Sequence, residues 1–350
     1  MINADFWKNK KILVTGHTGF VGAWLTMVLR FFEADVIGFS LQEEPASLYA
    51  KIKESLNIQS FYGDLRDASQ IELIVDSVRP DIVFHLAAFG FVKECYVDPV
   101  RAYSTNVGGT LNLMHAINET NTPCRIIVAS SDKVYDNVDA EMYLFNEGDP
   151  LGGIDPYSSS KTCEDILARS YYDTYLKEKC SVTIVRPSNI LGGGDHNINR
   201  LIPSIYYDLS NDGELSIRNP NSIRPWQNIF DVVDAYLTVA EYSKGGCNIY
   251  NVGPKPDGIK SVGDIATYVS KLYNGDLVIS SQKEEGVKEK TYLGLSIDRI
   301  KSDIGWEPTR SLEQTLDEIY EFYEADDGYN TYELCMKQIR EYYSQLEGIV

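Results

Sequence analysis

Short apolar runs alternate with longer amphipathic stretches through the first half of the chain. The apolar runs lie at residues 12–14, 36–39, 82–86, 126–129 and 182–185, and the amphipathic stretches between them lie at 20–32, 68–78, 99–119 and 158–177. Short β-branched runs bounded by helices are typical of a buried parallel sheet. The pattern therefore predicts an α/β fold with a doubly wound parallel sheet of the Rossmann type.

After about Ser188 the pattern loosens into loops rich in Gly, Asn and Pro. We expect a smaller C-terminal α/β lobe to begin there, and the chain to return once to the first domain. The boundaries we assign are 1–188 and 229–252 for the large domain, and 189–228 and 253–350 for the lobe. Further helices are expected at 262–272, 312–323 and 331–346.

The chain of 350 residues is strongly acidic, with 51 Asp and Glu against 32 Lys and Arg and a net charge of −19. Such a charge argues against nucleic acid and against an anionic membrane as partners, because phosphate groups attract basic surfaces. The excess gathers in residues 311–350, whereas residues 181–230 are neutral with four arginines and four acidic residues. A binding site for an anion therefore has to rest on a few placed arginines.

The cysteines carry no recognisable framework. Six are scattered, at Cys95, Cys124, Cys163, Cys180, Cys247 and Cys335, with no CxxC pair. They indicate reduced thiols in the cytoplasm and, with only four histidines, no metal site. No apolar segment of signal-peptide type precedes the first strand, and the most apolar stretch, 20–29, is about half the length that a membrane span needs.

A glycine loop follows the first expected strand. Gly16, Gly19 and Gly22 stand between a strand and the start of a helix. Here the first glycine would permit a tight turn, the second the approach of a pyrophosphate, and the third close helix–sheet packing. A purely structural turn is the alternative, but the position after the first strand favours a dinucleotide, which makes the large domain the dinucleotide-binding one.

The end of the second strand bears on which dinucleotide binds. The acid that grips a ribose hydroxyl in many NAD proteins is missing, and Ser40 stands there instead. No Arg or Lys occurs nearby before Lys51 to meet the extra phosphate of NADP, so NAD is preferred. Asp64, after the third strand, is a candidate for the adenine amine or simply a solvated turn residue.

Two further groups carry candidate chemistry. Tyr157 and Lys161 are spaced i, i+4 on an expected helix, so both project from one face, and a lysine beside a phenol would lower the pKa of that phenol. Such a tyrosine can accept a proton from a sugar hydroxyl. Ser131, Asp132 and Lys133 follow the fifth apolar strand, at the edge where parallel sheets bind ligands. The alternatives are a surface helix for the pair and a helix cap or polar turn for the triplet.

These residues resemble the extended short-chain dehydrogenase/reductase family, and within it the nucleotide-sugar 4,6-dehydratases, with the nearest likeness to the CDP-glucose branch. The resemblance covers about residues 6–323. It rests on 85–88, Asn106, the Tyr157/Lys161 pair, 186–189, the Ser-Asp-Lys stretch 131–137 and the runs 152–157, 192–195, 217–220 and 223–227.

The resemblance implies oxidation of a hexose at carbon 4, loss of water across carbons 5 and 6, and return of hydride to carbon 6. Tyr157 would accept the proton of the hydroxyl at carbon 4, and Ser131 would form a hydrogen bond with the oxygen of that hydroxyl. Asp132 would protonate the hydroxyl that leaves carbon 6. Lys133 would be the base at carbon 5, or would remain charged and stabilise the enolate. The implied contacts to NAD come from Gly16, Thr18, Gly19, Phe20, Val21, Gly22, Ser40, Asp64, Leu65, Leu86, Ala87, Ala88, Asn106, Tyr157 and Lys161.

The smaller lobe would then bind the nucleotide sugar, with a CDP-hexose favoured. The residues implied for the substrate are Phe89, Ser131, Asn189, Arg200, Arg218 and Arg224. Guanidinium groups match phosphate oxygens in pairs, although each arginine alone is commonly a surface residue. Phe89, Val134 and His196 depart from the usual Gln, Cys and Trp of the branch, and Phe89 bears most directly on the sugar.

Three other functions remain open from the sequence. The first is a nucleotide-sugar 4-epimerase, which needs no Asp132–Lys133 pair, and the second is a 4,6-dehydratase for another nucleotide sugar. The third is a non-catalytic protein that senses NAD, against which the presence of both Tyr157 and Lys161 argues. The family also implies a homodimer or higher homo-oligomer that pairs through residues 99–119 and 158–177.

Overall fold

The computed structural model describes residues 2–137, 142–211, 217, 219–242, 245–273, 291–326, 328 and 330–347. Its strands are β1 (Lys11–Thr15), β2 (Asp35–Ser40), β3 (Gln59–Tyr62), β4 (Ile82–His85), β5 (Arg125–Ala129), β6 (Ser181–Pro187), β7 (Asn189–Leu191), β8 (Ile223–Asn228), β9 (Cys247–Val252) and β10 (Ile259–Ser261). Its α-helices are α1 (Ala4–Trp7), α2 (Phe20–Phe31), α3 (Leu48–Leu56), α4 (Ala68–Val78), α5 (Val92–Val97), α6 (Pro99–Tyr103), α7 (Thr110–Glu119), α8 (Pro156–Tyr171), α9 (Leu201–Asn211), α10 (Ile229–Tyr242), α11 (Val262–Leu272), α12 (Asp298–Ile304), α13 (Leu312–Ala325) and α14 (Thr331–Glu347). Short 3₁₀ turns lie at Asp132–Val134 and Pro256–Gly258, and π-helical turns at Ser104–Gly109 and Tyr172–Leu176.

A parallel sheet forms the centre of the molecule. Within the described residues its seven strands run in the order β3-β2-β1-β4-β5-β6-β9. Thr15 at the end of β1 lies beside Phe39 of β2 on one side and His85 of β4 on the other. The order reverses between β1 and β4, and such a switch point is where open α/β sheets bind ligands. The predicted doubly wound sheet is confirmed.

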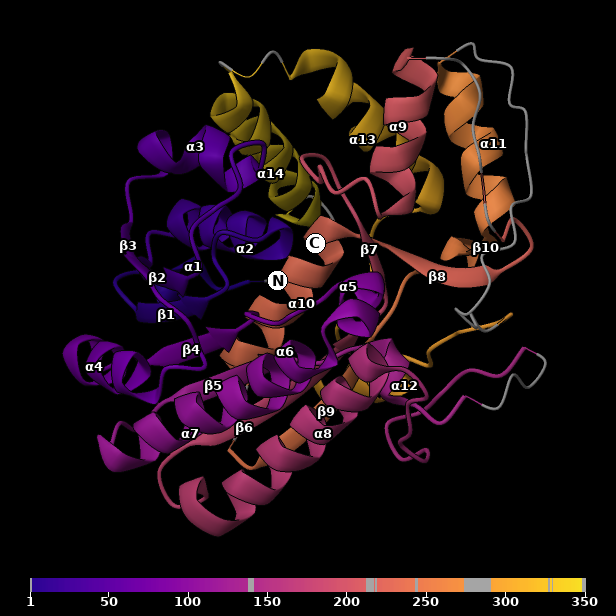
Figure 1. Cartoon of the computed structure of the whole chain (residues 1–350). Helices are drawn as coiled ribbons and strands as arrows, with labels where there is room; N and C mark the ends of the chain where they lie inside the picture. Colours follow the sequence, from indigo (N-terminus) through magenta and orange to yellow (C-terminus); the bar gives the residue numbers. More distant parts are fainter. Residues whose placement is uncertain are drawn as a thin grey trace.

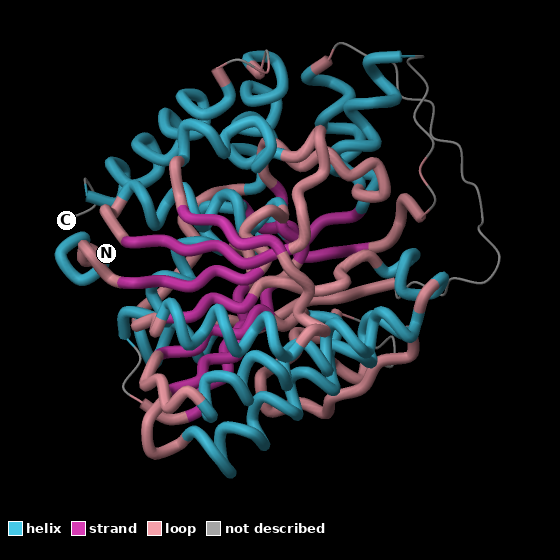
Figure 2. The backbone as a smooth tube through the Cα atoms, turned by 60° about the vertical axis from the view of Figure 1, so that its left-hand side comes forward, coloured by secondary structure: helices cyan, strands magenta, loops and turns pink. Residues whose placement is uncertain are grey.

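Both faces of the sheet are covered by helices (Figure 2). Successive side chains of a strand point to opposite faces, so Ile12 and Val14 join one hydrophobic core while Leu13 joins the other. The first core lies under α2, α3, α10 and α14, and the second lies under α4, α7 and α8. Burial on both faces explains the continuous apolar runs in the sequence.

A second, smaller sheet pairs β10 with β8 antiparallel and β8 with β7 parallel. Helices α9, α11 and α13 gather around it, away from the main sheet (Figure 1), and share a third core that includes Ile205, Ile265 and Leu316. The last helix, α14, which our boundaries place in the lobe, packs instead in the first core through Tyr342, whose ring stacks on Phe230 at 5.3 Å. The exact division of the chain stays a prediction.

Most helices begin and end within two residues of the predicted bounds, but two expected helices are interrupted. The stretch expected at 99–119 is divided into α6, a π-helical turn and α7, and the stretch expected at 158–177 ends in a second π-helical turn. π-Helical turns are rare inside helices and occur frequently at functional sites. The first of them holds Asn106, one of the predicted site residues.

Asp234 on α10 provides a test of how the C-terminal segment is held. Burial, together with the nearby charge of Asp231, raises the pKa of Asp234 to about 7, and the Trp306 indole donates a hydrogen bond to it at 3.0 Å. The unfolded chain would ionise this carboxyl near pH 4, so the group lowers the free energy of unfolding increasingly between about pH 4 and pH 7.

We expect Asp234→Asn to stabilise the protein by on the order of 2 kcal/mol at pH 8 and by little at pH 4, because the amide still accepts from Trp306 without a charge. Urea unfolding at both pH values measures this. Asp76→Asn, which changes an exposed carboxylate on α4, is the matched control and should leave stability nearly unchanged. An Asp234→Asn variant with equal effect at both pH values would contradict the assignment.

Candidate active site

The glycine loop lies between β1 and α2, at the switch point of the sheet. Gly16 has φ +79°, and a Cβ there would lie 2.7 Å from the backbone nitrogen of Ala87, so only glycine fits. A Cβ at Gly22 would lie 2.1 Å from the Gly16 carbonyl oxygen. At Gly19, by contrast, a Cβ would meet only that same oxygen, at 3.3 Å, among the described non-neighbouring atoms within 4 Å. The loop therefore fits a pyrophosphate at the N-terminus of α2, near Gly19, Phe20 and Val21.

Ser40 lies at the end of β2, where it shares a hydrogen bond of 2.7 Å with Thr18 of the glycine loop. No acidic residue stands at this position, but the structure places another acidic residue, Glu43, close to it, which the sequence analysis did not identify. The side chain of Glu43 is 5% exposed and binds Lys53 at 2.8 Å, and its second oxygen, Oε2, meets no donor at hydrogen-bonding geometry in the described residues. Burial opposes its ionisation, but Lys53 and the Tyr62 phenol hold the pKa of Glu43 below its usual value. A negative charge thus lies near the ends of β2 and β3.

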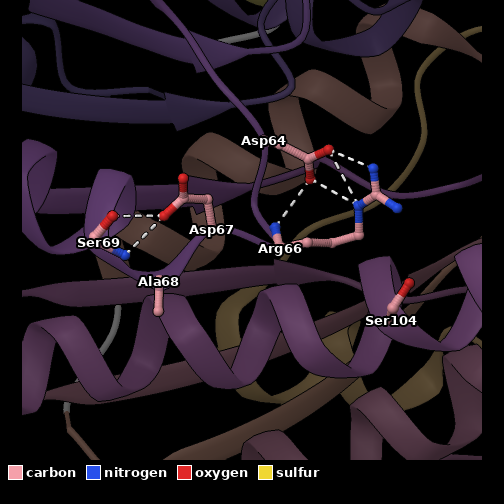
Figure 3. Close-up of a pocket in the computed structure, with 6 residues that line it drawn as sticks. All are labelled: Asp64, Arg66, Asp67, Ala68, Ser69 and Ser104. Carbon is pink, nitrogen blue, oxygen red and sulfur yellow. Dashed lines mark hydrogen bonds and ion pairs between the residues drawn. The ribbon is translucent and has the colours of Figure 1, made fainter.

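Asp64 follows β3 and lines an open depression of about 640 Å³ (Figure 3). Its carboxylate accepts hydrogen bonds from the backbone nitrogen of Arg66 at 2.9 Å and from the Arg66 guanidinium at 2.6–3.1 Å. Leu65 turns inward and is buried against Gly109. Asp64 therefore lies at the carboxyl end of β3, as predicted, but its carboxylate is bound by Arg66.

Asn106 connects the segment after β4 to α8. Its amide oxygen accepts from the Phe89 nitrogen at 2.7 Å, and its amide nitrogen donates to the Phe89 carbonyl at 3.2 Å and to Ser160 at 2.9 Å. The side chain is fully buried. Asn106 therefore holds the loop Leu86–Ala87–Ala88–Phe89 in place, and its π-helical turn directs the amide toward that loop.

Ser131, Asp132 and Lys133 form a short turn at the carboxyl end of β5. Ser131 donates to Asp132 at 3.1 Å and accepts from the Lys133 backbone nitrogen at 3.2 Å. Asp132 is 3% exposed, and its Oδ2 has no hydrogen-bond partner within the described chain. Burial raises the pKa of this carboxyl, against the opposing charges of Lys133 and Arg224. A buried acid with a free oxygen and a raised pKa is suited to donate a proton.

Tyr157 and Lys161 lie on the first turns of α8, which Asp155 caps by accepting from the Ser158 nitrogen at 3.0 Å. The Ser131 hydroxyl lies close enough to the Tyr157 phenol to lower its pKa, and the Lys133 ammonium lies 5.7 Å from the centre of the phenol ring. The turn after β5 and the start of α8 thus form one site, as the sequence predicted from two separate motifs.

The prediction that Lys161 lowers the pKa of Tyr157 is wrong in this structure, because the pKa of the phenol is raised. Burial raises the pKa of the phenol, with Asp132 and Glu164 acting in the same direction and Ser131 and Arg200 acting against them. Lys161 donates to the Ala129 carbonyl at 2.7 Å and forms an ion pair with Glu164. The Lys161 ammonium is therefore bound by the Ala129 carbonyl and the Glu164 carboxylate.

Glu164 is a residue that sequence reasoning missed. It is 1% exposed and accepts from Thr110 at 3.3 Å. Thr110 in turn contacts His85, whose other nitrogen contacts Thr15, both at 2.8 Å. Burial lowers the pKa of His85 to about 3, so the imidazole is neutral in this network. The only signal in the sequence was the i, i+3 spacing of Lys161 and Glu164.

The predicted substrate residues are placed unevenly. Arg200 pairs with Asp195 at 3.1 Å, and its guanidinium lies over the rings of Phe20 and Phe91 at 5.7 and 5.3 Å, close enough to affect Tyr157. Arg224 on β8 is buried, and its charge reaches Asp132. Arg218 lies outside the described residues. These two described arginines therefore join the catalytic cluster from the smaller lobe.

Asn189 and Phe89 border the same region less directly. Asn189 begins β7, half-buried beside Trp226 of β8. The Phe89 ring is half-buried and stacks under the Arg101 guanidinium at 4.6 Å. Phe89 thus presents an aromatic ring with a cation where the branch usually has an amide.

A doubly wound sheet has a glycine loop at its switch point, beside a half-buried tyrosine and a buried lysine, serine and aspartate. This arrangement defines an α/β protein built to bind a dinucleotide and to move protons. The chain belongs to the NAD dependent epimerase/dehydratase family, whose model matches residues 12–253. This confirms the resemblance drawn from the motifs.

Individual relatives agree with this family. The chain is 34% identical over 336 residues to a CDP-glucose 4,6-dehydratase of Salmonella typhimurium, covering 93% of both chains. It is 30% identical over 250 residues to a dTDP-D-glucose 4,6-dehydratase of Homo sapiens, covering 70% of this chain and 69% of that one. A crystal structure of a dTDP-glucose 4,6-dehydratase from Streptomyces venezuelae with NAD bound shares the fold with a TM-score of 0.80 and 24% identity, covering 91% and 98% of the two chains.

The described residues contain neither a membrane-spanning helix nor a cluster of metal ligands. None of the helices there is long and apolar enough to cross a membrane. No group of three or more His, Cys, Asp or Glu side chains in that part of the chain is arranged to hold a metal ion.

Proposed function

We propose that this protein is a nucleotide-sugar 4,6-dehydratase that converts CDP-glucose to CDP-4-keto-6-deoxyglucose. The observation that carries the proposal is Asp132, a buried carboxyl with an unpartnered oxygen next to Lys133 and Tyr157. Elimination of water needs an acid and a base beside the oxidation site, and this turn supplies both kinds of group. The likeness to a CDP-glucose 4,6-dehydratase over 93% of the chain supports the same substrate.

NAD would be held by the glycine loop, Ser40, the Asp64–Leu65 segment, the Leu86–Ala88 segment, and Tyr157 with Lys161. When bound, this cofactor supplies the acceptor and donor of hydride. The protein itself moves the protons: Tyr157 accepts one from the hydroxyl at carbon 4, and Ser131 holds the oxygen that remains. Lys161 and Glu164 position α8 against β5 through the Ala129 carbonyl.

The resulting ketone makes the hydrogen at carbon 5 acidic. We assign Lys133 as the base that removes it, and Asp132 as the acid that protonates the hydroxyl leaving carbon 6. Burial raises the pKa of Asp132, which favours the protonated form that a general acid needs. Arg200, Arg218 and Arg224, with Asn189, would bind the pyrophosphate and nucleotide, and Phe89 would contact the sugar.

Incubation with CDP-glucose and NAD⁺ tests the proposal. We expect a 4-keto product lighter by one water and strongly absorbing in alkali. Recovery of an isomer at carbon 4 without loss of mass would instead establish the 4-epimerase that the sequence left open, and no turnover despite NAD binding would favour the sensor.

The nucleotide is tested separately, by thermal shift with CDP-, GDP-, UDP- and dTDP-glucose. The true substrate should stabilise the folded protein by a free energy of RT ln(1+[L]/Kd), where [L] is the ligand concentration, and so raise the melting temperature. We expect the largest shift with CDP-glucose. A larger shift with another nucleotide would move the proposal to a 4,6-dehydratase for that sugar.

Glu43 should contribute to the choice of NAD over NADP. Its negative charge near the ends of β2 and β3 would repel the extra phosphate of NADP. We expect Glu43→Gln to improve NADP binding by about tenfold relative to NAD, measured by titration with each dinucleotide. Glu44→Gln, at the exposed neighbouring carboxylate, is the control. An unchanged NADP-to-NAD ratio would contradict this role.

We further propose that the protein forms a cytoplasmic homodimer. Its six cysteines are all free thiols, as expected in a reducing compartment. Helices α6, α7 and α8 lie side by side on one face of the molecule (Figures 1 and 2). This face exposes large apolar side chains at Val100, Tyr103, Leu111, Ile166 and Tyr175. Pairing of two such faces would cover them, and light scattering would then show twice the monomer mass.

A further inference from the structure

Two cysteines meet at the amino-terminal edge of the main sheet, opposite the edge that carries the active site. Cys124 precedes β5 and Cys180 precedes β6, and the next residues, Arg125 and Ser181, are paired in the parallel ladder. The Ser181 nitrogen donates to the Cys124 carbonyl at 3.2 Å. Neighbouring strands lie about 4.8 Å apart, which is within the Cα spacing that a disulfide requires.

The two thiols point to the same face of the sheet. Both belong to the second hydrophobic core, as expected for paired positions of neighbouring strands. The Cys180 thiol donates a hydrogen bond to the Thr122 carbonyl at 3.5 Å. The neighbouring Cys124 thiol, aided by the charge of Lys179 and opposed by burial, lowers the pKa of Cys180. A lowered pKa increases the fraction of Cys180 present as the reactive thiolate near neutral pH.

A cavity of about 450 Å³ adjoins both cysteines. It is lined by Phe6, Lys10, Asp81, Ile82, Pro123, Cys124, Arg125, Lys179, Cys180, Ser181 and Gly245. The single carboxylate in this lining, Asp81, already accepts from the Lys11 backbone nitrogen at 2.9 Å. Three basic residues, Lys10, Arg125 and Lys179, line the same cavity as the two cysteines, although the whole chain has a net charge of −19. The cavity therefore favours an anionic reactant.

We propose that Cys124 and Cys180 form a dithiol site that exchanges with an anionic low-molecular-weight disulfide, such as glutathione disulfide. The Cys180 thiolate attacks one sulfur of the reagent, which forms a mixed disulfide and releases one thiolate. Cys124 then loses its proton to solvent and attacks the Cys180 sulfur. This second step forms the Cys124–Cys180 disulfide and releases the second thiolate, so the two protein thiols are oxidised and the reagent is reduced to two thiols.

The experiment uses the full-length protein with Cys163→Ser, which removes the exposed cysteine. Glutathione disulfide is added at pH 7, and the modified peptides are followed by mass spectrometry. We expect a transient glutathione adduct on Cys180, followed by a protein lighter by two hydrogens with Cys124 linked to Cys180. In the Cys124→Ser variant the adduct should persist, and in Cys180→Ser the reaction should be slower by about tenfold, in line with the lower thiolate fraction.

Two measurements on the unsubstituted protein make the test independent of variant folding. Cys180 should begin to react at a lower pH than an ordinary thiol, whose pKa is near 8.5. Cystamine, a cationic disulfide, should react more slowly than glutathione disulfide because Lys10, Arg125 and Lys179 line the same cavity. Reaction at Cys163 alone would overturn the proposal. So would equal rates for Cys180→Ser and its parent, or an adduct that never proceeds to the internal disulfide.

Discussion

Replacement of Tyr157 by phenylalanine is expected to lower kcat by about 10²–10⁴-fold while cofactor binding stays near normal. The substitution removes only the hydroxyl beside Ser131, and the ring keeps its place on the first turn of α8. Without the phenol hydroxyl no group accepts the proton of the sugar hydroxyl at carbon 4, so the first step fails. Steady-state turnover of CDP-glucose measures the loss, and thermal shift with NAD⁺ measures retained binding.

The matched control is Tyr242→Phe, at an exposed tyrosine in the last turn of α10. It should leave kcat within about twofold of the parent, as expected for an exposed position away from the site. If Tyr157→Phe instead retained turnover within a few-fold, another group would be the proton acceptor at carbon 4. The cluster around Ser131 would then need a different assignment.

Asp132→Asn is expected to reduce water elimination by about 10²–10⁴-fold and to separate it from removal of the carbon 5 hydrogen. The amide can still accept from Ser131 but has no proton to give to the departing hydroxyl. Because Lys133 remains, the hydrogen at carbon 5 should still exchange. In D₂O we expect recovered CDP-glucose that carries deuterium at carbon 5 but has lost no water.

Lys133→Met provides the comparison for this experiment. It removes the amine while keeping an apolar chain of similar length, and it should abolish both deuterium incorporation and water loss. Deuterium in the sugar recovered from Lys133→Met would mean that Lys133 stabilises the enolate rather than removing the hydrogen. Near-normal elimination by Asp132→Asn would show that another acid protonates the leaving group.

Features that depend on backbone conformation and on residue order could be predicted from the sequence. Gly16 and Gly22 are required by the chain itself, because a Cβ at either position would collide with backbone atoms. The apolar runs identified strands because a parallel sheet is buried on both faces. Ser131–Lys133 and Tyr157 were located by their positions relative to predicted elements, and the structure brings them together at one edge.

The protonation and the hydrogen-bond partners of the side chains in the site could not be predicted in the same way. Lys161 was expected to lower the pKa of Tyr157, but its ammonium forms an ion pair with Glu164, and burial raises the pKa of the phenol. Asp64 was a candidate for the adenine amine, yet its carboxylate is bound by Arg66. In each case a partner within three residues along the chain decides the outcome, but only the rotamers and burial reveal the contact.

By itself, the sequence determined the fold class, the glycine loop and the family, because these depend on the order and spacing of residues along the chain. The tertiary structure decided which charges meet: Glu43 near the ends of β2 and β3, Arg224 beside Asp132, and Cys124 beside Cys180. Electrostatic effects fall steeply with distance and grow with burial, and neither quantity is contained in sequence spacing. That is why residue types predicted a site, and only the folded arrangement set the protonation of its groups.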